Sequence, residues 1–115
     1  MVSAEHLALP VVVSAPAEID ITNAAQLGAA VLAAKSSSPA VVVDMSQTVF
    51  CDSYGVRTLV QAYRSDGGEV RLVITSKAVL RVFSLIGVDQ LFPTFTSLPD
   101  ALADGSPTAI RASDP

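Results

Sequence analysis

The segment between an apolar strand and the helix that follows it holds the residues best suited to chemistry. Asp52 and Ser53 fall where this helix should begin, and Gly55 follows, allowing a partner's backbone to approach closely. The first N–H groups of a helix lack partners and carry partial positive charge, so an anion is favoured there. A serine hydroxyl at this position can accept a phosphoryl group, which brings about −1.5 to −2 charges. The simpler alternative is that Asp52 or Ser53 only caps the helix.

Other reactive side chains give weaker signals. Cys51 stands beside Asp52, and a thiol near a helix N-terminus can have a lowered pKa and act as a redox sensor. We favour the alternative that Cys51 is a small buried hydrophobe, which is how free cysteine usually behaves. A nucleophilic pair of Cys51 with His6 is not expected, because His6 lies in an N-terminal segment expected to be frayed and no other residue could orient it. Asp44 and Asp52 are read as structural or partner-contacting groups rather than as a general acid–base pair.

Five of the seven basic residues lie within one 25-residue stretch: Arg57, Arg64, Arg71, Lys77 and Arg81. They could form a patch for an acidic partner or a nucleotide. We favour the alternative that they are ordinary solvated side chains spread over three elements.

The elements that position these residues follow from hydrophobic patterning. Runs rich in β-branched residues predict strands at 9–13, 40–44 and 69–74, with shorter extended segments at 18–21 and 91–95. Apolar residues at helical spacing predict helices at 24–35, 53–65, 77–86 and 98–102. Thr22 or Asn23 is expected to cap the first helix, and Lys35 to interact favourably with the dipole at its end. Val49 and Phe50 are expected to turn inward from the loop before Ser53.

Strands that alternate with helices indicate one α/β domain with a mostly parallel or mixed sheet. We expect four to five strands and about four helices. The predicted domain covers 9–103, preceded by an N-terminal extension at 1–8 and followed by a flexible tail at 104–115.

Composition excludes several classes of function. The chain has 115 residues, half of them hydrophobic, and a formal net charge of −4, which argues against nucleic-acid binding. One Cys and one His leave little from which to build a zinc site, and no glycine-rich phosphate loop opens a helix. We therefore expect no metal and no cofactor. No secretory signal and no apolar run of bilayer length is visible, so we expect a cytoplasmic protein without membrane insertion.

Three short strings match, in order, segments of one protein family. Residues 43–46 and 49–55 resemble its apolar strand ending in Asp-(Leu/Met)-Ser, an apolar pair and then Asp-Ser-(Ser/Thr)-Gly. Residues 18–24 are similar to its Gly-Glu-(Leu/Ile)-Asp segment, and residues 87–92 to its Gly-Leu-x-x-x-Phe segment. Over roughly 11–102, the chain thus resembles the STAS domain family, whose small members are anti-sigma factor antagonists (anti-anti-sigma factors). The chain departs from the family's pattern at Ala17, Cys51 and Tyr54.

The resemblance implies a STAS-like fold and a regulatory role without enzymatic activity. In the family, the Ser that maps onto Ser53 is phosphorylated by the partner anti-sigma factor, a GHKL-type serine kinase, and a serine phosphatase reverses this. The unphosphorylated form binds the anti-sigma factor and frees the sigma factor. The partner surface implied for this chain comprises Glu18, Asp20, Thr22, Asn23, Asp52, Ser53, Tyr54, Gly55 and Arg57. We expect a monomer or weak dimer.

A second function of a different class is compatible with the same residues. The chain would then be a STAS interaction subunit that is not phosphorylated, such as an accessory subunit of a membrane transport system. It would use the same surface constitutively, and its genomic neighbours would be transporter components rather than a kinase or sigma factor.

Overall fold

Parallel strands form the centre of the molecule. The computed structural model describes residues 10–103, so the predicted segments 1–8 and 104–115 lie outside the described residues. The main sheet has four strands in the order β1-β3-β5-β6, and a separate pair joins β2 to β4. All of these pairings are parallel. The strands are β1 (Val11–Ser14), β2 (Glu18–Ile19), β3 (Ala40–Met45), β4 (Phe50–Cys51), β5 (Glu69–Ile74) and β6 (Thr94–Phe95).

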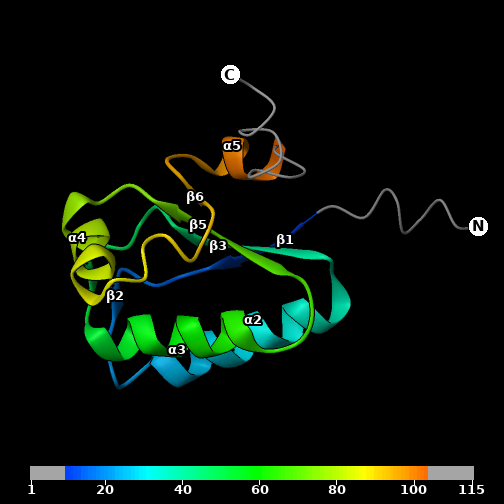
Figure 1. Cartoon of the computed structure of the whole chain (residues 1–115), viewed down its shortest axis with the longest axis horizontal. Helices are drawn as coiled ribbons and strands as arrows, with labels where there is room; N and C mark the ends of the chain where they lie inside the picture. The colour runs from blue at the N-terminus through cyan, green and yellow to red at the C-terminus, as the bar shows by residue number, and fades with distance from the viewer. Residues whose placement is uncertain (1–9, 104–115) are drawn as a thin grey trace, which may run out of the picture.

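The helices lie on both faces and at one end of the sheet. They are α2 (Ala24–Ser37), α3 (Ser53–Arg64), α4 (Lys77–Ile86) and α5 (Leu98–Ala103). Helices α2 and α3 lie side by side on one face, α5 covers the opposite face, and α4 packs beside β4 and β5 (Figure 1). The α/β STAS-like fold class expected from the sequence is confirmed, with parallel pairing among the described strands.

The two faces of β3 explain its unbroken apolar run. Val41 and Val43 point into the larger core under α2 and α3, whereas Val42 points into a smaller core under α5. Alternate side chains of a strand face opposite sides, so a strand covered on both sides has apolar residues at every position. The continuous run therefore predicted the central position of β3 correctly.

Lys35 contributes to the packing of α2 against α3 in a way that the sequence did not indicate. It lies in the last turn of α2, but its side chain is buried at 3% exposure. Its ammonium donates hydrogen bonds to the carbonyl oxygens of Ala62 at 2.7 Å and Tyr63 at 3.0 Å, and to that of Ser65. Lys35 thus caps the C-terminal end of the neighbouring helix α3, where unpaired carbonyls carry partial negative charge.

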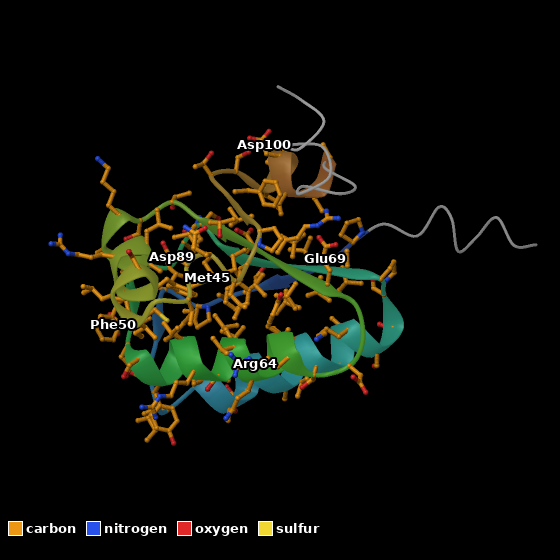
Figure 2. The ribbon with its side chains drawn as sticks, viewed as in Figure 1. Met45, Phe50, Arg64, Glu69, Asp89 and Asp100 are labelled. Carbon is orange, nitrogen blue, oxygen red and sulfur yellow. The ribbon has the colours of Figure 1, made fainter. Side chains whose placement is uncertain are left out.

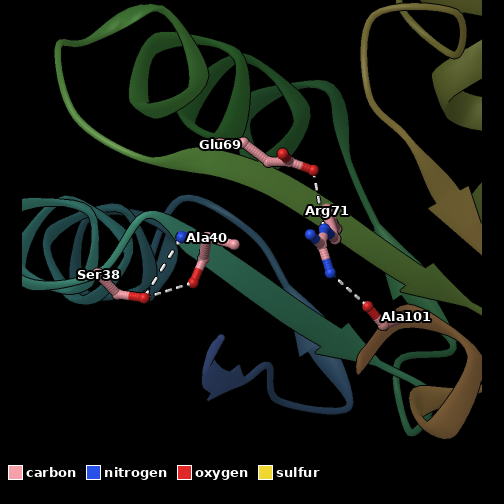
Figure 3. Close-up of polar contacts among 5 residues, drawn as sticks. All are labelled: Ser38, Ala40, Glu69, Arg71 and Ala101. Atoms are coloured by element: carbon pink, nitrogen blue, oxygen red, sulfur yellow. Dashed lines mark hydrogen bonds and ion pairs between the residues drawn. The ribbon is translucent and has the colours of Figure 1, made fainter. Parts of the chain in front are cut away.

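A second buried cation anchors α5 to the sheet. Arg71 on β5 is 2% exposed, and its Nε donates to Glu69 Oε2 at 2.8 Å. Its Nη1 donates to the carbonyl oxygen of Ala101 in α5 at 2.6 Å (Figure 3). The expectation that Arg71 is an ordinary solvated side chain was wrong, because the face of β5 that carries it is covered by α5.

The loop between β3 and α3 also differs from its prediction. It contains the two-residue strand β4, which pairs with β2, where the sequence suggested irregular structure. Cys51 faces the core, so its strand neighbour Phe50 faces outward, as alternation requires. Val49 is 63% exposed and Phe50 is 50% exposed, so the expectation that both turn inward was wrong.

Candidate functional site

Pairing of β2 with β4 brings two distant segments of the chain together. Glu18 lies opposite Phe50, and Ile19 lies opposite Cys51. The pairing continues one residue further, where the Asp52 N–H donates to the Ile19 carbonyl oxygen at 3.1 Å. Asp20 and Asp52 therefore leave the carboxyl ends of two hydrogen-bonded strands, and the loop after Asp20 lies beside the start of α3.

Asp52 is the N-cap of α3. Its Oδ1 accepts a hydrogen bond from the Gly55 N–H at 3.0 Å, and its carbonyl oxygen accepts one from the Val56 N–H at 3.1 Å. Capping of this kind satisfies first-turn N–H groups that have no partner within the helix. The sequence left open whether Asp52 or Ser53 caps the helix. The structure shows that Asp52 is the cap and that Ser53 is not.

Ser53 is the first residue of α3 and is exposed to solvent. Among the described residues, no side-chain hydrogen bond involves its hydroxyl. A hydroxyl in this position is accessible to another protein's active site. A phosphate attached to it would stand at the positive end of a 12-residue helix, but next to the carboxylate of Asp52.

The loop after β2 is ordered by its own side chains. Asp20 Oδ1 accepts hydrogen bonds from the Thr22 N–H at 2.9 Å and the Thr22 hydroxyl at 2.5 Å. These bonds, the hydroxyl's first, lower the pKa of the Asp20 carboxyl, so the group is a carboxylate at neutral pH. Asn23 Nδ2 donates to the Glu18 carbonyl oxygen at 2.7 Å, and Asn23 Oδ1 accepts from the Asp20 N–H at 3.0 Å.

Asn23 occupies the N-cap position of α2, but its side chain makes no capping bond to that helix. Its side chain bonds instead to the backbone of Glu18 and Asp20 in the preceding segment. The result is a rigid turn that presents the carboxylate of Asp20 beside the start of α3.

Gly55 has a packing role that differs from the one expected. It is buried, and a Cβ at this position would lie 2.6 Å from Ile19 Cγ2 and 2.8 Å from Cys51 Sγ. Only glycine lets α3 begin this close to β2 and β4. We correct the expectation that Gly55 admits a partner's backbone, because its Cα already faces the protein's own core.

Cys51 is buried beside this contact. It is 1% exposed, and burial together with the nearby Asp52 raises the pKa of its thiol to about 12. A thiol that stays protonated at neutral pH lacks the thiolate needed for ready oxidation. The structure therefore favours the packing role for Cys51 over the redox role.

Large apolar side chains are exposed on the loop after β2, on β4 and on helices α3 and α4, and most of them were missed by sequence reasoning. Ile21 and Tyr54 are 63% and 50% exposed, and Phe50 lies at the end of the molecule between α4 and the start of α3 (Figure 2). On α4, Leu85 is 78% exposed. The exposure of Leu85 could have been predicted from the sequence, because Leu85 lies outside the apolar stripe of its amphipathic helix. The exposure of Phe50 and Ile21 could not, because a two-residue strand and a single loop residue show no periodic pattern.

Four of the five basic residues in the stretch 57–81 lie on the surfaces of helices α3 and α4. Arg57, Arg64, Lys77 and Arg81 are exposed, as expected for solvated side chains. Arg57 lies four residues after Ser53 and so shares its face of α3. Within residues 10–103, no group of three or more His, Cys, Asp or Glu side chains is placed to hold a metal ion. No helix in this part of the chain is long and apolar enough to cross a membrane.

Comparison with known proteins agrees with this arrangement. The STAS domain model matches residues 1–101. An anti-sigma-F factor antagonist, RsfB, from Mycobacterium tuberculosis is 32% identical over 94 residues, which covers 79% of this chain and 77% of that protein. The crystal structure of an anti-sigma factor antagonist from Mycobacterium paratuberculosis superimposes with a TM-score of 0.71 at 34% identity, covering 87% of this chain and 84% of that one.

A STAS domain protein from Planctomyces limnophilus shares the fold at 22% identity. Its TM-score is 0.69, and the superposition covers 85% of this chain and 91% of that one. The family model spans most of the sequence, and the two solved structures share the fold of this chain. The chain belongs to the STAS domain family.

Proposed function

We propose that this chain is an anti-sigma factor antagonist controlled by phosphorylation of Ser53. In its unphosphorylated form it binds an anti-sigma factor that is a GHKL-type serine kinase, and the sigma factor is released. Phosphorylation of Ser53 by that kinase ends the interaction, and a serine phosphatase restores it. The protein is the kinase's substrate rather than an enzyme.

One observation carries this proposal: an accessible serine hydroxyl at a helix start, surrounded by surface suited to a partner. Ser53 is exposed while its neighbour Asp52 caps the helix. Exposed apolar side chains flank it, among them Phe50 and Tyr54. The anti-sigma factor antagonists named above are similar in sequence and fold, which supports the same class of partner for this chain.

The structure also supports a physical account of the switch. A phosphate on Ser53 would place about −1.5 to −2 charges beside Asp52, in a region that also holds the carboxylate of Asp20. In a complex this region loses much of its water, so like-charge repulsion and the desolvation of the phosphate both oppose binding. Leaving a charge uncompensated in an interface costs on the order of 2–5 kcal/mol, or roughly 30-fold or more in affinity.

The catalytic groups for phosphorylation belong to the kinase. The antagonist has to supply a hydroxyl, held at a defined position by the rigid start of α3. Asp52 contributes to this rigidity through its side-chain bond to the Gly55 N–H and through its carbonyl oxygen, which accepts the first backbone bond of the helix. Tyr54, where the family usually has a small hydroxyl residue, is exposed next to Ser53 and would contact the kinase directly.

The test uses the purified protein, a purified anti-sigma factor kinase and ATP. We expect one phosphate, located on Ser53 by mass spectrometry. Ser53→Ala should bind without being labelled, and Ser53→Asp should lose most of the binding. Ser36→Ala and Ser36→Asp, at an exposed position near the other end of α2, serve as controls and should behave like the wild type.

Labelling that persists in Ser53→Ala would contradict the proposed site. Failure of the wild-type protein to bind any anti-sigma factor would contradict the function itself. Constitutive binding to components of a membrane transport system, without labelling of Ser53, would favour the alternative STAS interaction subunit.

A further inference from the structure

A groove runs between α2 and α3, starting near the end of the molecule where Ser53 lies. Its volume is about 440 Å³. Its lining residues come from the loop after β2 and from both helices: Ile21, Ala25, Gly28, Ala29, Leu32, Tyr54, Thr58, Gln61 and Ala62. None of these residues is charged, which distinguishes the groove from the acidic surface around Asp20 and Asp52.

Differences in side-chain size create the groove. At its floor α2 and α3 approach so closely that a Cβ on Gly28 would lie 2.6 Å from Thr58 Cγ2. Ala25 and Ala29 add little bulk above this contact. Ile21, Leu32 and Tyr54 rise around it and are 63%, 43% and 50% exposed, so large apolar side chains surround a floor of small ones.

The groove is mainly apolar, because few of its side chains have polar groups. The Thr58 hydroxyl donates to the Tyr54 carbonyl oxygen at 2.9 Å and is thereby satisfied, so Thr58 presents its methyl group. Of the remaining side chains, the Tyr54 hydroxyl and the Gln61 amide are the polar groups. A surface of this kind matches apolar side chains and offers no countercharge for a phosphate or an acidic peptide.

The groove is continuous with the surface proposed to bind the anti-sigma factor. Tyr54 follows Ser53 directly in the sequence and lines the groove, and Ile21 does the same after Asp20. A kinase that covers the Ser53 hydroxyl must therefore lie over the mouth of the groove. We propose that an apolar segment of the anti-sigma factor, outside its active site, inserts between α2 and α3.

This inference rests on the proposed function and assigns different roles to two parts of the binding surface. The acidic region around Ser53 makes binding depend on phosphorylation, whereas the groove supplies apolar contact whose strength does not depend on charge. Aromatic and aliphatic anchors that fill such pockets carry much of the free energy of protein binding. A charge placed within the groove should therefore weaken the complex even when Ser53 is unphosphorylated.

The test compares two substitutions of the same kind on α2. Ala29→Glu places a carboxylate in the groove, whereas Ala33→Glu places it one turn later at an exposed position that does not line the groove. Dissociation constants for the purified anti-sigma factor are measured by calorimetry with unphosphorylated protein. We expect Ala29→Glu to weaken binding about tenfold or more and Ala33→Glu to change it by less than about twofold.

Leu32→Lys, at another exposed wall of the groove, should weaken binding in the same way. It keeps the test decisive if Ala29→Glu disturbs the fold as judged by circular dichroism. If the wild-type protein binds the anti-sigma factor and both Ala29→Glu and Leu32→Lys bind it with the wild-type affinity, the groove proposal is wrong while the proposed function stands. If the wild-type protein does not bind at all, the proposed function itself has failed.

Light scattering, which measures the oligomeric state, tests the alternative that a second copy of this chain occupies the groove. Loss of a dimer in the groove variants, with unchanged affinity for the anti-sigma factor, would overturn the proposal in favour of self-association.

Discussion

Replacement of Lys35 by methionine tests whether a buried ammonium holds α2 and α3 together. Methionine keeps most of the length and apolar bulk of the lysine stem, so the packing of the stem is largely preserved. What disappears is the ammonium that donates to the carbonyl oxygens of Ala62, Tyr63 and Ser65. The substitution therefore isolates the polar contribution of one side chain.

The structure allows the cost to be estimated. A hydrogen bond to a charged group contributes about 1.5–3 kcal/mol. The carbonyl of Ser65 belongs to an exposed residue and can bind water in the variant, whereas Ala62 is 2% exposed. Counting one to two bonds as lost gives a decrease of about 1.5–6 kcal/mol in the free energy of unfolding. Each kcal/mol shifts Tm by about 4–8 °C in a domain of this size, so a decrease of at least about 6 °C is expected.

Urea unfolding followed by circular dichroism provides the measurement, because the chain has no Trp to report by fluorescence. Lys77→Met is the matched control. Lys77 is exposed at the start of α4, so its replacement should change the free energy of unfolding by less than about 0.5 kcal/mol.

A solvated lysine that interacted only with the dipole of its own helix would contribute about 0.3–1 kcal/mol. A loss within that range, or equal losses for Lys35→Met and Lys77→Met, would refute the interhelical role of Lys35.

Two further predictions concern the packing beneath Ser53. Gly55→Ala should destabilise the protein by about 1–3 kcal/mol in urea, although alanine is the better helix former, because its Cβ would lie 2.6 Å from Ile19 Cγ2. A variant as stable as the wild type would show that α3 can move aside. Because burial and Asp52 raise the pKa of the Cys51 thiol to about 12, iodoacetamide at pH 8 should alkylate the folded protein far more slowly than the urea-unfolded chain. The same shift should lower stability as the pH rises from about 9 toward 12, since only the unfolded chain then loses the proton; rapid alkylation of the folded protein would contradict both expectations.

These features together describe a surface with a rigid base. Asp52 caps α3, Gly55 allows its close packing, and the side chains of Thr22 and Asn23 order the adjacent loop. A helix start held in this way limits the conformational entropy that is lost when a partner binds. If Ser53 is phosphorylated as proposed, we expect the phosphate to act locally, through its charge at the start of α3.

Much of the architecture followed from the sequence, because its longer elements carry a readable pattern. The unbroken apolar run of β3 indicated a strand covered on both faces, and the amphipathic spacing of α3 and α4 indicated which of their faces is buried. The Asp52-Ser53 pair at the start of α3 was also recognisable, since capping residues mark helix starts. These signals are local, so they survive without knowledge of the fold.

Tertiary structure alone decided three features. The pairing of β2 with β4 joins Asp20 to the start of α3, but two-residue strands are too short to show a period of alternation. The same pairing leaves Phe50 facing outward. The carbonyl partners of Lys35 and Arg71 lie about 30 residues further along the chain. The sequence does not distinguish a lysine or arginine solvated by water from one that donates to distant carbonyl oxygens, because those carbonyl oxygens are brought together only when the chain folds.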